Sequence, residues 1–231
     1  MTKCYLCDGD QASQRKGRVW DNPNAKINQC NKCGLVFLTG VDEVDYEAGG
    51  MHGGVKEAVP VEQWLRETRR DDNRRFECLR EQMTGKTILD FGCGAGGFLL
   101  FARNVAESVT GVELDQTLAT HFKTNGINVA EDIKELGTVK KYDVITAFHV
   151  VEHLQDPRGT LRELMGLLAP GGQIIIEVPS ANDALLDIYK CQPFTEFTYW
   201  SCHLYLFNAA TLERLAIQAG LSVNYVKHIQ R

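Results

Sequence analysis

The segment from Ile88 to Phe98 constrains the fold most, because an apolar run ends in an acid and glycine then recurs at alternate positions. An apolar helical pattern follows, so this order predicts a strand, a tight turn and a helix N-terminus. Glycines allow the backbone to approach a ligand that a side chain would displace, and the helix N-terminus adds N–H donors with a partial positive charge. Glu113 ends a second apolar run, at a place where an acid can bind two ribose hydroxyls.

Strands and helices alternate through the rest of the chain. Apolar runs predict strands near 86–91, 109–113, 127–130, 142–147, 173–178 and 221–227. Helical spacing predicts helices near 96–106, 115–125, 157–168 and 209–219. Such alternation predicts an α/β fold with a doubly wound, mostly parallel, Rossmann-like sheet, in which ligands bind beyond the C-terminal strand ends. The strand at 173–178 is almost continuously apolar, so we expect both of its faces to be covered.

A helix is also expected before the first of these strands. Apolar residues from Val61 to Met83 follow helical spacing, with a polar break at Asp72. The arginines of this segment lie mostly off the apolar stripe and are mixed with acids: Arg66, Arg69, Arg70, Arg74, Arg75 and Arg80. A solvated face is the default interpretation, and an anion-binding face is the alternative. Residues 41–60 hold paired glycines and few apolar residues, which indicates a linker or loop.

Four of the eight cysteines form two CxxC pairs, Cys4 with Cys7 and Cys30 with Cys33. Each CxxC turn can present two thiolates to one ion, and Gly34 permits a tight turn after Cys33. Two such turns complete a tetrahedral shell typical of structural zinc, whereas a redox dithiol needs only one CxxC. Residues 1–40 are too few for a good apolar core, so metal would supply much of the folding energy. With four protein ligands this metal is expected to be structural.

Composition limits the class of protein. The 231 residues are 44% hydrophobic and 24% charged, which is typical of a soluble globular protein. The net charge of −5 provides no general attraction to nucleic acid or to membranes. No apolar run approaches the length of a membrane span and no signal peptide is recognised, so we expect a cytoplasmic protein with reduced thiols.

Motifs farther along the chain indicate a family. Residues 142–154 read YDVITAFHVVEHL, and Pro170-Gly171-Gly172 precedes an isoleucine run. Together with D-x-G-x-G-x-G at 90–96 and Glu113, these motifs resemble class I S-adenosylmethionine-dependent methyltransferases, in family order, over roughly 86–227. With the cysteine pairs, the chain resembles small-molecule and sugar methyltransferases of the type 11, 12 and 23 groups that carry an N-terminal zinc ribbon. The family sheet normally ends in an antiparallel seventh strand. Too few residues follow 221–227 for it, so we expect a truncated chain or a different sheet ending.

The resemblance implies a set of cofactor contacts. The residues concerned are Asp90, Gly92, Gly94, Gly96, Glu113, Leu114, Asp132 and Phe148. Asp90 would contact the amino group of S-adenosylmethionine, the glycine backbone would face its methionine and ribose, and Glu113 would bind both ribose hydroxyls. Leu114 and Asp132 would contact the adenine, and Phe148 would flank the methyl-donor centre. Cys93 lies in the same turn and is interpreted as a small filler.

A hydroxyl acceptor needs a base as well as alignment. The candidates are His149, Glu152, His153 and His203. His203 is favoured, because a histidine near this place is catalytic in related sugar C-methyltransferases; a structural histidine is the alternative. Some quinone-biosynthesis and small-RNA methyltransferases carry E-x-x-E-H here and use a divalent metal, so these four residues could form a metal site. The ordinary role of Glu152 and His153 in the wider family is to anchor loops by hydrogen bonds.

The predicted organisation has three parts: a zinc ribbon at 1–40, a linker and helix at 41–85, and the methyltransferase domain at 86–231. Within the last part, 181–207 is expected to be a substrate lid. Its aromatic side chains could equally line a substrate wall or form the core of the lid.

The favoured acceptor is a small hydroxylated metabolite, in particular a nucleotide-linked sugar or glycan precursor. RNA is the rival, because ribosomal-RNA methyltransferases also carry N-terminal zinc modules and Arg15-Lys16-x-Arg18 could contact phosphates. The acidic pI and the lack of N/D-P-P-Y after the fourth strand disfavour RNA. Two other classes are a non-catalytic zinc-ribbon adaptor, against which the intact cofactor motif argues, and an NAD-dependent oxidoreductase. Gly92, Gly94 and Gly97 fit the dinucleotide pattern loosely, but Asp90 suits a cationic ligand better than a pyrophosphate.

Overall fold

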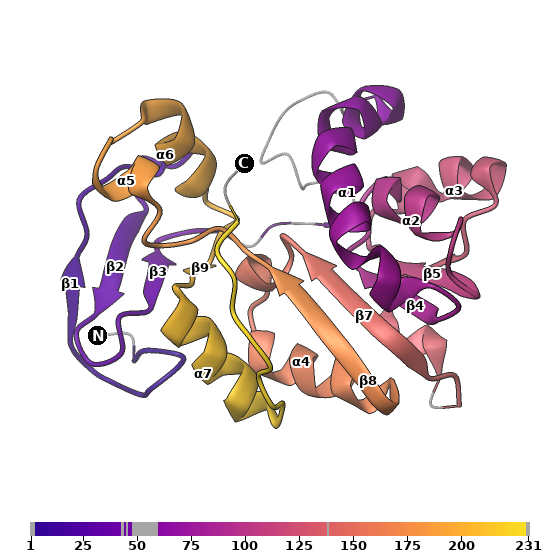
Figure 1. The fold of residues 1–231 in the computed structure, drawn as a ribbon. Coiled ribbons are helices and arrows are strands. Elements are labelled where there is room, and N and C mark those ends of the chain that lie inside the picture. Colours follow the sequence, from indigo (N-terminus) through magenta and orange to yellow (C-terminus); the bar gives the residue numbers. More distant parts are fainter. Residues whose placement is uncertain (1–2, 43, 45, 48–59, 138, 230–231) are drawn as a thin grey trace. The chain divides into compact units, whose positions relative to one another are not determined.

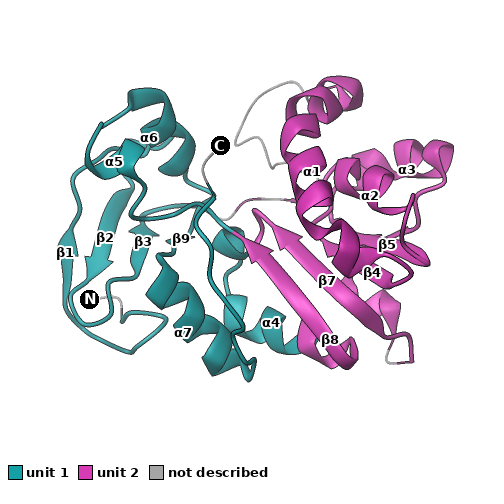
Figure 2. Ribbon diagram, in the orientation of Figure 1, with its two compact units in different colours: residues 1–43, 151–163, 178–231 teal, residues 44–150, 164–177 magenta. Residues whose placement is uncertain are grey.

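The computed structural model describes residues 3–42, 44, 46–47, 60–137 and 139–229. The chain divides into two compact units, coloured separately in Figure 2. Unit 1 comprises 1–43, 151–163 and 178–231, and unit 2 comprises 44–150 and 164–177. Most of the linker predicted at 41–60 lies outside the described residues.

Unit 2 is built on a five-stranded parallel sheet in the order β6-β5-β4-β7-β8 (Figure 1). The strands are β4 (Thr87–Phe91), β5 (Ser108–Val112), β6 (Val129–Ala130), β7 (Tyr142–Phe148) and β8 (Leu168–Glu177). The chain first builds outward from β4 to β5 and β6, and then returns to β7 on the other side. The ends of β4 and β7 therefore flank the switch point, where sheets of this kind bind ligands. The predicted parallel α/β sheet is confirmed.

Helices α1 (Val61–Met83) and α2 (Gly97–Ala102) pack together against this sheet. Their shared core consists of Phe76, Leu79, Met83, Ile88, Phe98, Ala102 and Val144. A second cluster joins α2 to the 3-10 turn η2 (Gln116–Leu118) and to α3 (Ala119–Asn125). Helix α1 runs through the polar break expected at Asp72, because this residue is buried and its carboxylate lies 3.3 Å from the Arg75 guanidinium one turn later.

Strand β8 differs from its expected burial. The apolar residues Ile174 to Ile176 are only half-buried. Among the described residues β8 pairs with β7 alone, so it lies at the edge of the sheet. An edge strand lacks a neighbouring strand on one side, which explains why its side chains keep more exposure than those of β7.

Unit 1 contains a four-stranded antiparallel sheet in the order β1-β2-β3-β9. Its strands are β1 (Ala12–Gln14), β2 (Lys26–Cys30), β3 (Val36–Thr39) and β9 (Tyr205–Leu206). The last strand comes from the insert predicted at 181–207. Val36 and Leu38 of the ribbon share one core with Tyr199 and Leu206 of the insert. The ribbon and the insert thus fold as one body, and the independence of 1–40 as a domain stays a prediction.

Polar contacts also join the ribbon to the insert. The Arg15 guanidinium donates to the Asp187 carboxylate and to the Ala181 carbonyl, each at 2.6 Å. The Asp21 carboxylate accepts from the backbone N–H of Ser201 at 3.0 Å. Tyr199 and Phe207 are buried, whereas Tyr189 and Phe197 are 72% and 46% exposed. The aromatics of the insert therefore divide between its core and its surface.

The remaining elements are α4 (Pro157–Gly166), η3 (Ile133–Leu136), η4 (Val151–His153), α5 (Ala184–Asp187), α6 (Gln192–Thr198) and α7 (Ala209–Ala219). Asn208 and Thr211 form a capping box at the start of α7, and Gly220 ends it in the left-handed conformation. These local signals explain why the helix predicted at 209–219 is confirmed. The strand predicted at 221–227 is wrong, because 221–229 has no regular structure and pairs with no strand of the described residues. No helix in the described part of the chain has the length and apolar character to cross a membrane.

Candidate cofactor and metal sites

The glycine turn joins β4 to α2. Gly92, Gly94 and Gly96 have φ values of 69°, 52° and 76°, in the left-handed region that favours glycine. A Cβ atom at Gly94 would lie 2.9 Å from the Trp64 ring, so a side chain there would need the ring to move. The tight turn predicted after β4 is therefore present, with Gly92 and Gly94 half-buried and Gly96 buried, and the contact of its backbone with a cofactor stays a prediction.

Glu113 follows β5 and lies against this turn. Its Oε2 accepts from the Gly94 N–H at 2.7 Å, and its Oε1 accepts from the Asp115 N–H at 3.1 Å. Burial raises the pKa of Glu113, although the N–H groups of Asp115 and Gly94 oppose this. Each carboxylate oxygen has a second lone pair, so the group can still accept from two hydroxyls. This arrangement fits the diol of a ribose.

Asp90 lies inside the same edge. Its side chain is 3% exposed and accepts from the Thr146 hydroxyl at 2.6 Å. Burial raises the pKa of Asp90 to about 7, against the lowering effects of Thr146 and the Arg75 charge. A cationic ligand would favour the ionised form, so this carboxylate fits a ligand with an ammonium group. Burial also raises the pKa of the neighbouring Cys93 thiol, which packs beneath the turn as a small filler.

Three further predicted contacts lie along this edge or beside it. Phe148 ends β7, with its ring edge-on to Phe98 at 5.0 Å and its face 4.6 Å from the Arg75 guanidinium. Leu114 directly follows Glu113 and is 41% exposed, as an adenine wall would need to be. Asp132 follows β6, but its carboxylate accepts from the Lys134 N–H at 2.8 Å and caps η3. The cofactor roles of all three stay predictions.

Sequence reasoning missed a charged cluster at the same edge. Arg74 and Arg75 both bind the Glu177 carboxylate at the end of β8, and Arg75 is 8% exposed. The expectation of a solvated arginine face is therefore wrong for these two residues. The signals that could have revealed them are an acid directly after three isoleucines, and an acid–arginine pair three residues apart within α1.

Of the three histidine candidates for the base, His149 lies in unit 2, and His153 and His203 lie in unit 1. His203 is 3% exposed, and its Nδ1 lies 2.8 Å from the Thr198 carbonyl oxygen. The rings of His153 and His203 have centroids 4.8 Å apart. Together with Cys202 they form a group whose candidate ligand atoms lie within 4.8 Å of one another. The four-residue metal set expected from the E-x-x-E-H resemblance stays a prediction, since this group contains only two of its members.

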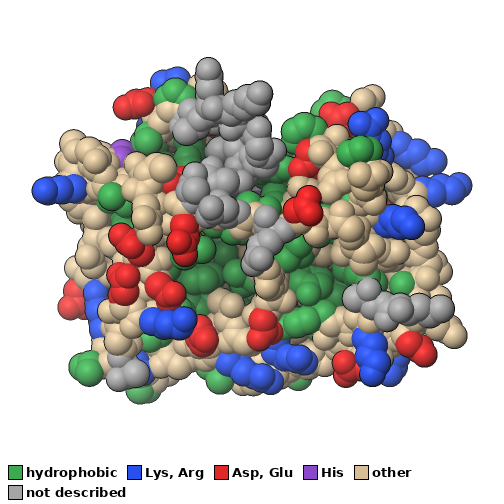
Figure 3. Space-filling model, turned by 180° about the vertical axis from the view of Figure 1, so that it is seen from behind, with side chains coloured by type: hydrophobic (Ala, Val, Ile, Leu, Met, Phe, Trp, Pro, Cys, Tyr) green, Lys and Arg blue, Asp and Glu red, His purple; other side chains and the backbone are tan. Residues whose placement is uncertain are grey.

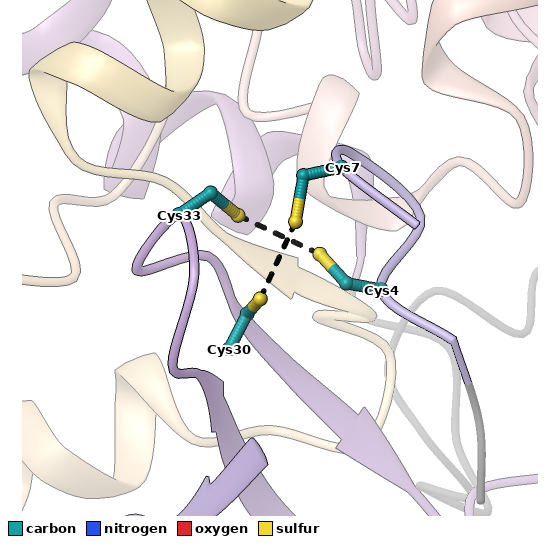
Figure 4. A group of neighbouring side chains, drawn as sticks. All are labelled: Cys4, Cys7, Cys30 and Cys33. Carbon is teal, nitrogen blue, oxygen red and sulfur yellow. Dashed lines mark hydrogen bonds between the residues drawn. The ribbon is translucent and has the colours of Figure 1, made fainter. Parts of the chain in front are cut away.

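The four paired cysteines converge in unit 1 (Figure 4). The Sγ atoms of Cys4 and Cys33 are 3.6 Å apart, and those of Cys7 and Cys30 are 3.5 Å apart. Burial opposes ionisation of Cys30, but the backbone N–H groups of Cys33 and Lys32 lower its pKa to about 7. Gly34, with φ of 80°, makes the turn after Cys33 as predicted. Four thiols at this spacing could hold one tetrahedral ion.

We predict that about one zinc ion per chain occupies this cluster. Cys30→Ser should lose the ion and lower the thermal midpoint by about 5 °C or more, because the ion holds both CxxC turns of the ribbon together. Metal analysis and calorimetry measure both effects. Cys78→Ser is the matched control, since Cys78 is exposed and lies outside the cluster. A wild-type protein without bound metal after purification in zinc-containing buffer would contradict the prediction.

The raised pKa of Asp90 predicts a pH-dependent stability. The unfolded carboxyl titrates near 3.9, whereas the folded one titrates at about 7. Between these values the folded state retains a proton that the unfolded state releases. The destabilisation of the folded state by Asp90 therefore grows as pH rises, and it levels off above pH 7. Asp90→Asn should match the wild type near pH 4 and exceed its stability at pH 8 by on the order of 3 kcal/mol.

Urea unfolding at both pH values measures this difference. Other buried acids, Glu113 among them, add a similar pH dependence to both proteins, so the comparison between variant and wild type is the informative quantity. An equal stability difference at pH 4 and pH 8 would rule out a raised pKa at Asp90.

Comparison with known proteins places these sites in a family. The family described as "Methyltransferase domain" matches residues 64–226. A ubiquinone biosynthesis O-methyltransferase of Pseudomonas savastanoi is 33% identical over 114 residues, which cover 45% of this chain and 48% of that protein. The corresponding protein of Coxiella burnetii is 28% identical over 118 residues, covering 47% and 50%. The chain thus spans about half the length of these curated relatives.

Solved structures share the fold. An S-adenosylmethionine-dependent methyltransferase from Archaeoglobus fulgidus aligns with a TM-score of 0.53 and 23% identity, over 69% of this chain and 72% of its own. One from Mesorhizobium loti aligns with a TM-score of 0.51 and 20% identity, over 67% and 84%. Since the family match covers more than half of the sequence, the chain belongs to the methyltransferase-domain family, and it shares its fold with solved S-adenosylmethionine-dependent methyltransferases.

Proposed function

We propose that the chain methylates a hydroxyl group of a small metabolite, and that the favoured acceptor is a nucleotide-linked sugar or glycan precursor. The use of S-adenosylmethionine as the methyl donor is supported by two acids at one edge of the sheet. The Glu113 carboxylate accepts a hydrogen bond from the backbone of the glycine turn, and Asp90 is buried beside it. One acid fits a ribose and the other fits an ammonium group, and S-adenosylmethionine carries both. We retain a cytoplasmic location as part of this proposal, because the paired cysteines would bind metal as reduced thiols.

The cofactor, when bound, supplies an electrophilic methyl group, and this chain's residues would bind and align it. Asp90 would hold the ammonium group, Glu113 the ribose hydroxyls, and the backbone at Gly92, Gly94 and Gly96 the chain between them. Leu114 and Asp132 would contact the adenine, and Phe148 would exclude water from the reacting centre. These roles are the ones that the family resemblance implies, and the place of the residues at or beside the C-terminal strand ends supports them.

The curated relatives are named O-methyltransferases, which favours an oxygen acceptor. An alcohol must lose its proton as the new bond forms, so a base is required. His203, His149 and His153 are the candidates from the sequence. The insert at 181–207 shares its core with the zinc ribbon, and we propose that this combined body recognises the acceptor.

RNA is the second candidate acceptor. Lys16, Arg18 and Lys26 of the ribbon are exposed and could contact phosphates. The face drawn in Figure 3 carries acidic as well as basic side chains. Together with the net charge of −5, this distribution favours the metabolite.

Glu113→Ala should weaken S-adenosylhomocysteine binding by about 100-fold, because two hydrogen bonds to one charged group are lost. Isothermal titration calorimetry measures the change. Glu107→Ala is the matched control, an exposed acid just before β5 in the same unit. Tight binding of NADH to the wild type, with none of S-adenosylhomocysteine, would contradict the cofactor assignment.

Labelled methyl transfer into a cell extract should place the label in the small-molecule fraction. The measurement uses methyl-labelled S-adenosylmethionine, and the extract is separated into small molecules, nucleic acid and protein. Glu113→Ala serves as the inactive control. Nuclease-sensitive label would favour the RNA candidate instead, and cofactor binding without any label would favour the non-catalytic adaptor.

A further inference from the structure

The Glu177 carboxylate, at the C-terminal end of β8 in unit 2, is surrounded by three nitrogen-bearing side chains. Arg74 Nη2 donates to both oxygens of Glu177, at 2.8 and 2.9 Å. Arg75 donates to Glu177 Oε1 through Nη2 at 2.8 Å and through Nε at 3.3 Å. His149 Nε2 lies 3.5 Å from the same oxygen. The Glu177 side chain is only 14% exposed, so these groups meet in a partly desolvated place.

Two acids of α1 restrain these arginines on the same helix. Asp71 Oδ1 lies 3.3 Å from Arg74 Nε, and Asp72 Oδ1 lies 3.3 Å from Arg75 Nη1. The Arg75 guanidinium also stacks over the Phe148 ring. A carboxylate bonded to two restrained guanidinium groups has little freedom to rotate. Glu177 is therefore fixed in position by α1.

His149 is held through its backbone as well as its ring. Its φ of 57° is in the left-handed region, which is uncommon for a residue other than glycine. Its N–H donates to the Glu177 carbonyl oxygen at 2.8 Å, which continues the β7–β8 pairing one residue beyond Phe148. Glu177 thus sets both the backbone and the imidazole direction of His149, at the strand end where the methyl-donor centre is proposed.

We propose that Glu177 is a positioning residue that binds the Nε2–H of His149 and so makes Nδ1 of His149 the base for the methyl acceptor. This inference rests on the proposed function. His149 Nδ1 takes the hydroxyl proton while the acceptor oxygen bonds to the methyl carbon, and the electron pair of the breaking carbon–sulfur bond stays on sulfur. Arg74 and Arg75 position the carboxylate and contact no reacting atom.

Burial favours His149 over His203, the first choice from the sequence. His149 directly follows Phe148 and is half-buried in the unit that carries Asp90 and Glu113. His203 is 3% exposed, with its Nδ1 at the Thr198 carbonyl. A base must reach an acceptor, so a fully enclosed imidazole is less suited to this role.

The charges around His149 determine its pH response. Glu177 of β8 contacts the imidazole and favours its cationic form, whereas Arg74 and Arg75 of α1, which bind the same carboxylate, disfavour it. Asp71 and Asp72 of α1 contact the arginines, and Asp90 of β4 interacts with the Arg75 charge, so these acids offset the arginines. Burial would raise the pKa of Glu177, but His149 and the arginines hold it well below its usual range, so this carboxylate is ionised at every working pH. Removing its charge would leave the two arginines, which still contact Asp71 and Asp72, less fully compensated beside the imidazole.

The test is Glu177→Gln, followed by histidine NMR on the full chain with bound S-adenosylhomocysteine and by the pH profile of kcat. His149→Gln assigns the His149 signal. In the wild type, the nitrogen shifts should show the neutral His149 with hydrogen on Nε2. In Glu177→Gln the titration midpoint of His149 should fall by about 1 unit. The acidic limb of kcat should fall with it, kcat should drop about 10-fold or more, and S-adenosylmethionine KM should change less than about threefold.

Asp143→Asn is the matched control. Asp143 lies at the opposite end of β7 and binds Thr87, so its removal should leave the His149 midpoint unchanged. Glu177→Asp should restore part of the kcat loss. A His149 midpoint that does not move in folded Glu177→Gln would overturn the proposal. If that variant does not fold, the wild-type tautomer decides: hydrogen on Nδ1 overturns it.

Failure of the inference and failure of the proposed function give different results. An unchanged His149 midpoint with intact methyl transfer would reject only the role of Glu177. If the wild type neither binds S-adenosylhomocysteine nor transfers a methyl group, the proposed function itself is rejected.

Discussion

The parallel pairing of β4 between β5 and β7 is the constraint on which the site depends. Because parallel strands all end at the same edge, residues that are far apart in the sequence meet there: Asp90 near the end of β4, Glu113 after β5, Phe148 and His149 at the end of β7, and Glu177 at the end of β8. A shift of one residue in any of these pairings would turn the corresponding side chain to the other face of the sheet. The buried apolar residues of β4 and β7 set that register, so the packing of the core also sets the geometry of the site.

The acids at this edge divide into two electrostatic classes. Burial raises the pKa of Asp90 and Glu113, whose hydrogen bonds come from a hydroxyl or from backbone N–H groups and not from a paired cation. Glu177 is paired with two arginines and its pKa is lowered. A buried acid without a direct cationic partner costs stability that a cationic or hydrogen-bonding ligand can return, whereas a paired acid is already satisfied and serves to hold its neighbours. The first class therefore suits ligand binding, and the second suits positioning.

The ribbon that carries the four cysteines also forms part of a hydrophobic core with the insert at 181–207. Ribbon strand β3 pairs with β9, and buried side chains of the ribbon and of the insert form one core. Arg15 and Asp21 add polar contacts to the insert's backbone and to Asp187. A ribbon of about 40 residues buries too little apolar surface to be stable on this basis alone. Sharing a core with the insert gives both segments the burial that neither has by itself, and it makes the four-cysteine cluster relevant to the fold of the proposed lid.

The sequence by itself determined the features that depend on short stretches of chain: the glycine turn, the two CxxC turns, helix α7 with its caps, and the alternation that predicts a parallel sheet. Turn conformation, capping and periodicity are local properties, so neighbouring residues suffice to specify them. Only the tertiary structure decided the burial of Arg74 and Arg75, the pairing of β9 with the ribbon, the exposure of β8 and the absence of a strand at 221–227. Each of these depends on a partner distant in the sequence. An arginine in an amphipathic helix has the same local pattern whether it faces water or a carboxylate a hundred residues away, and an apolar segment becomes a strand only where another strand offers its unpaired N–H and C=O groups.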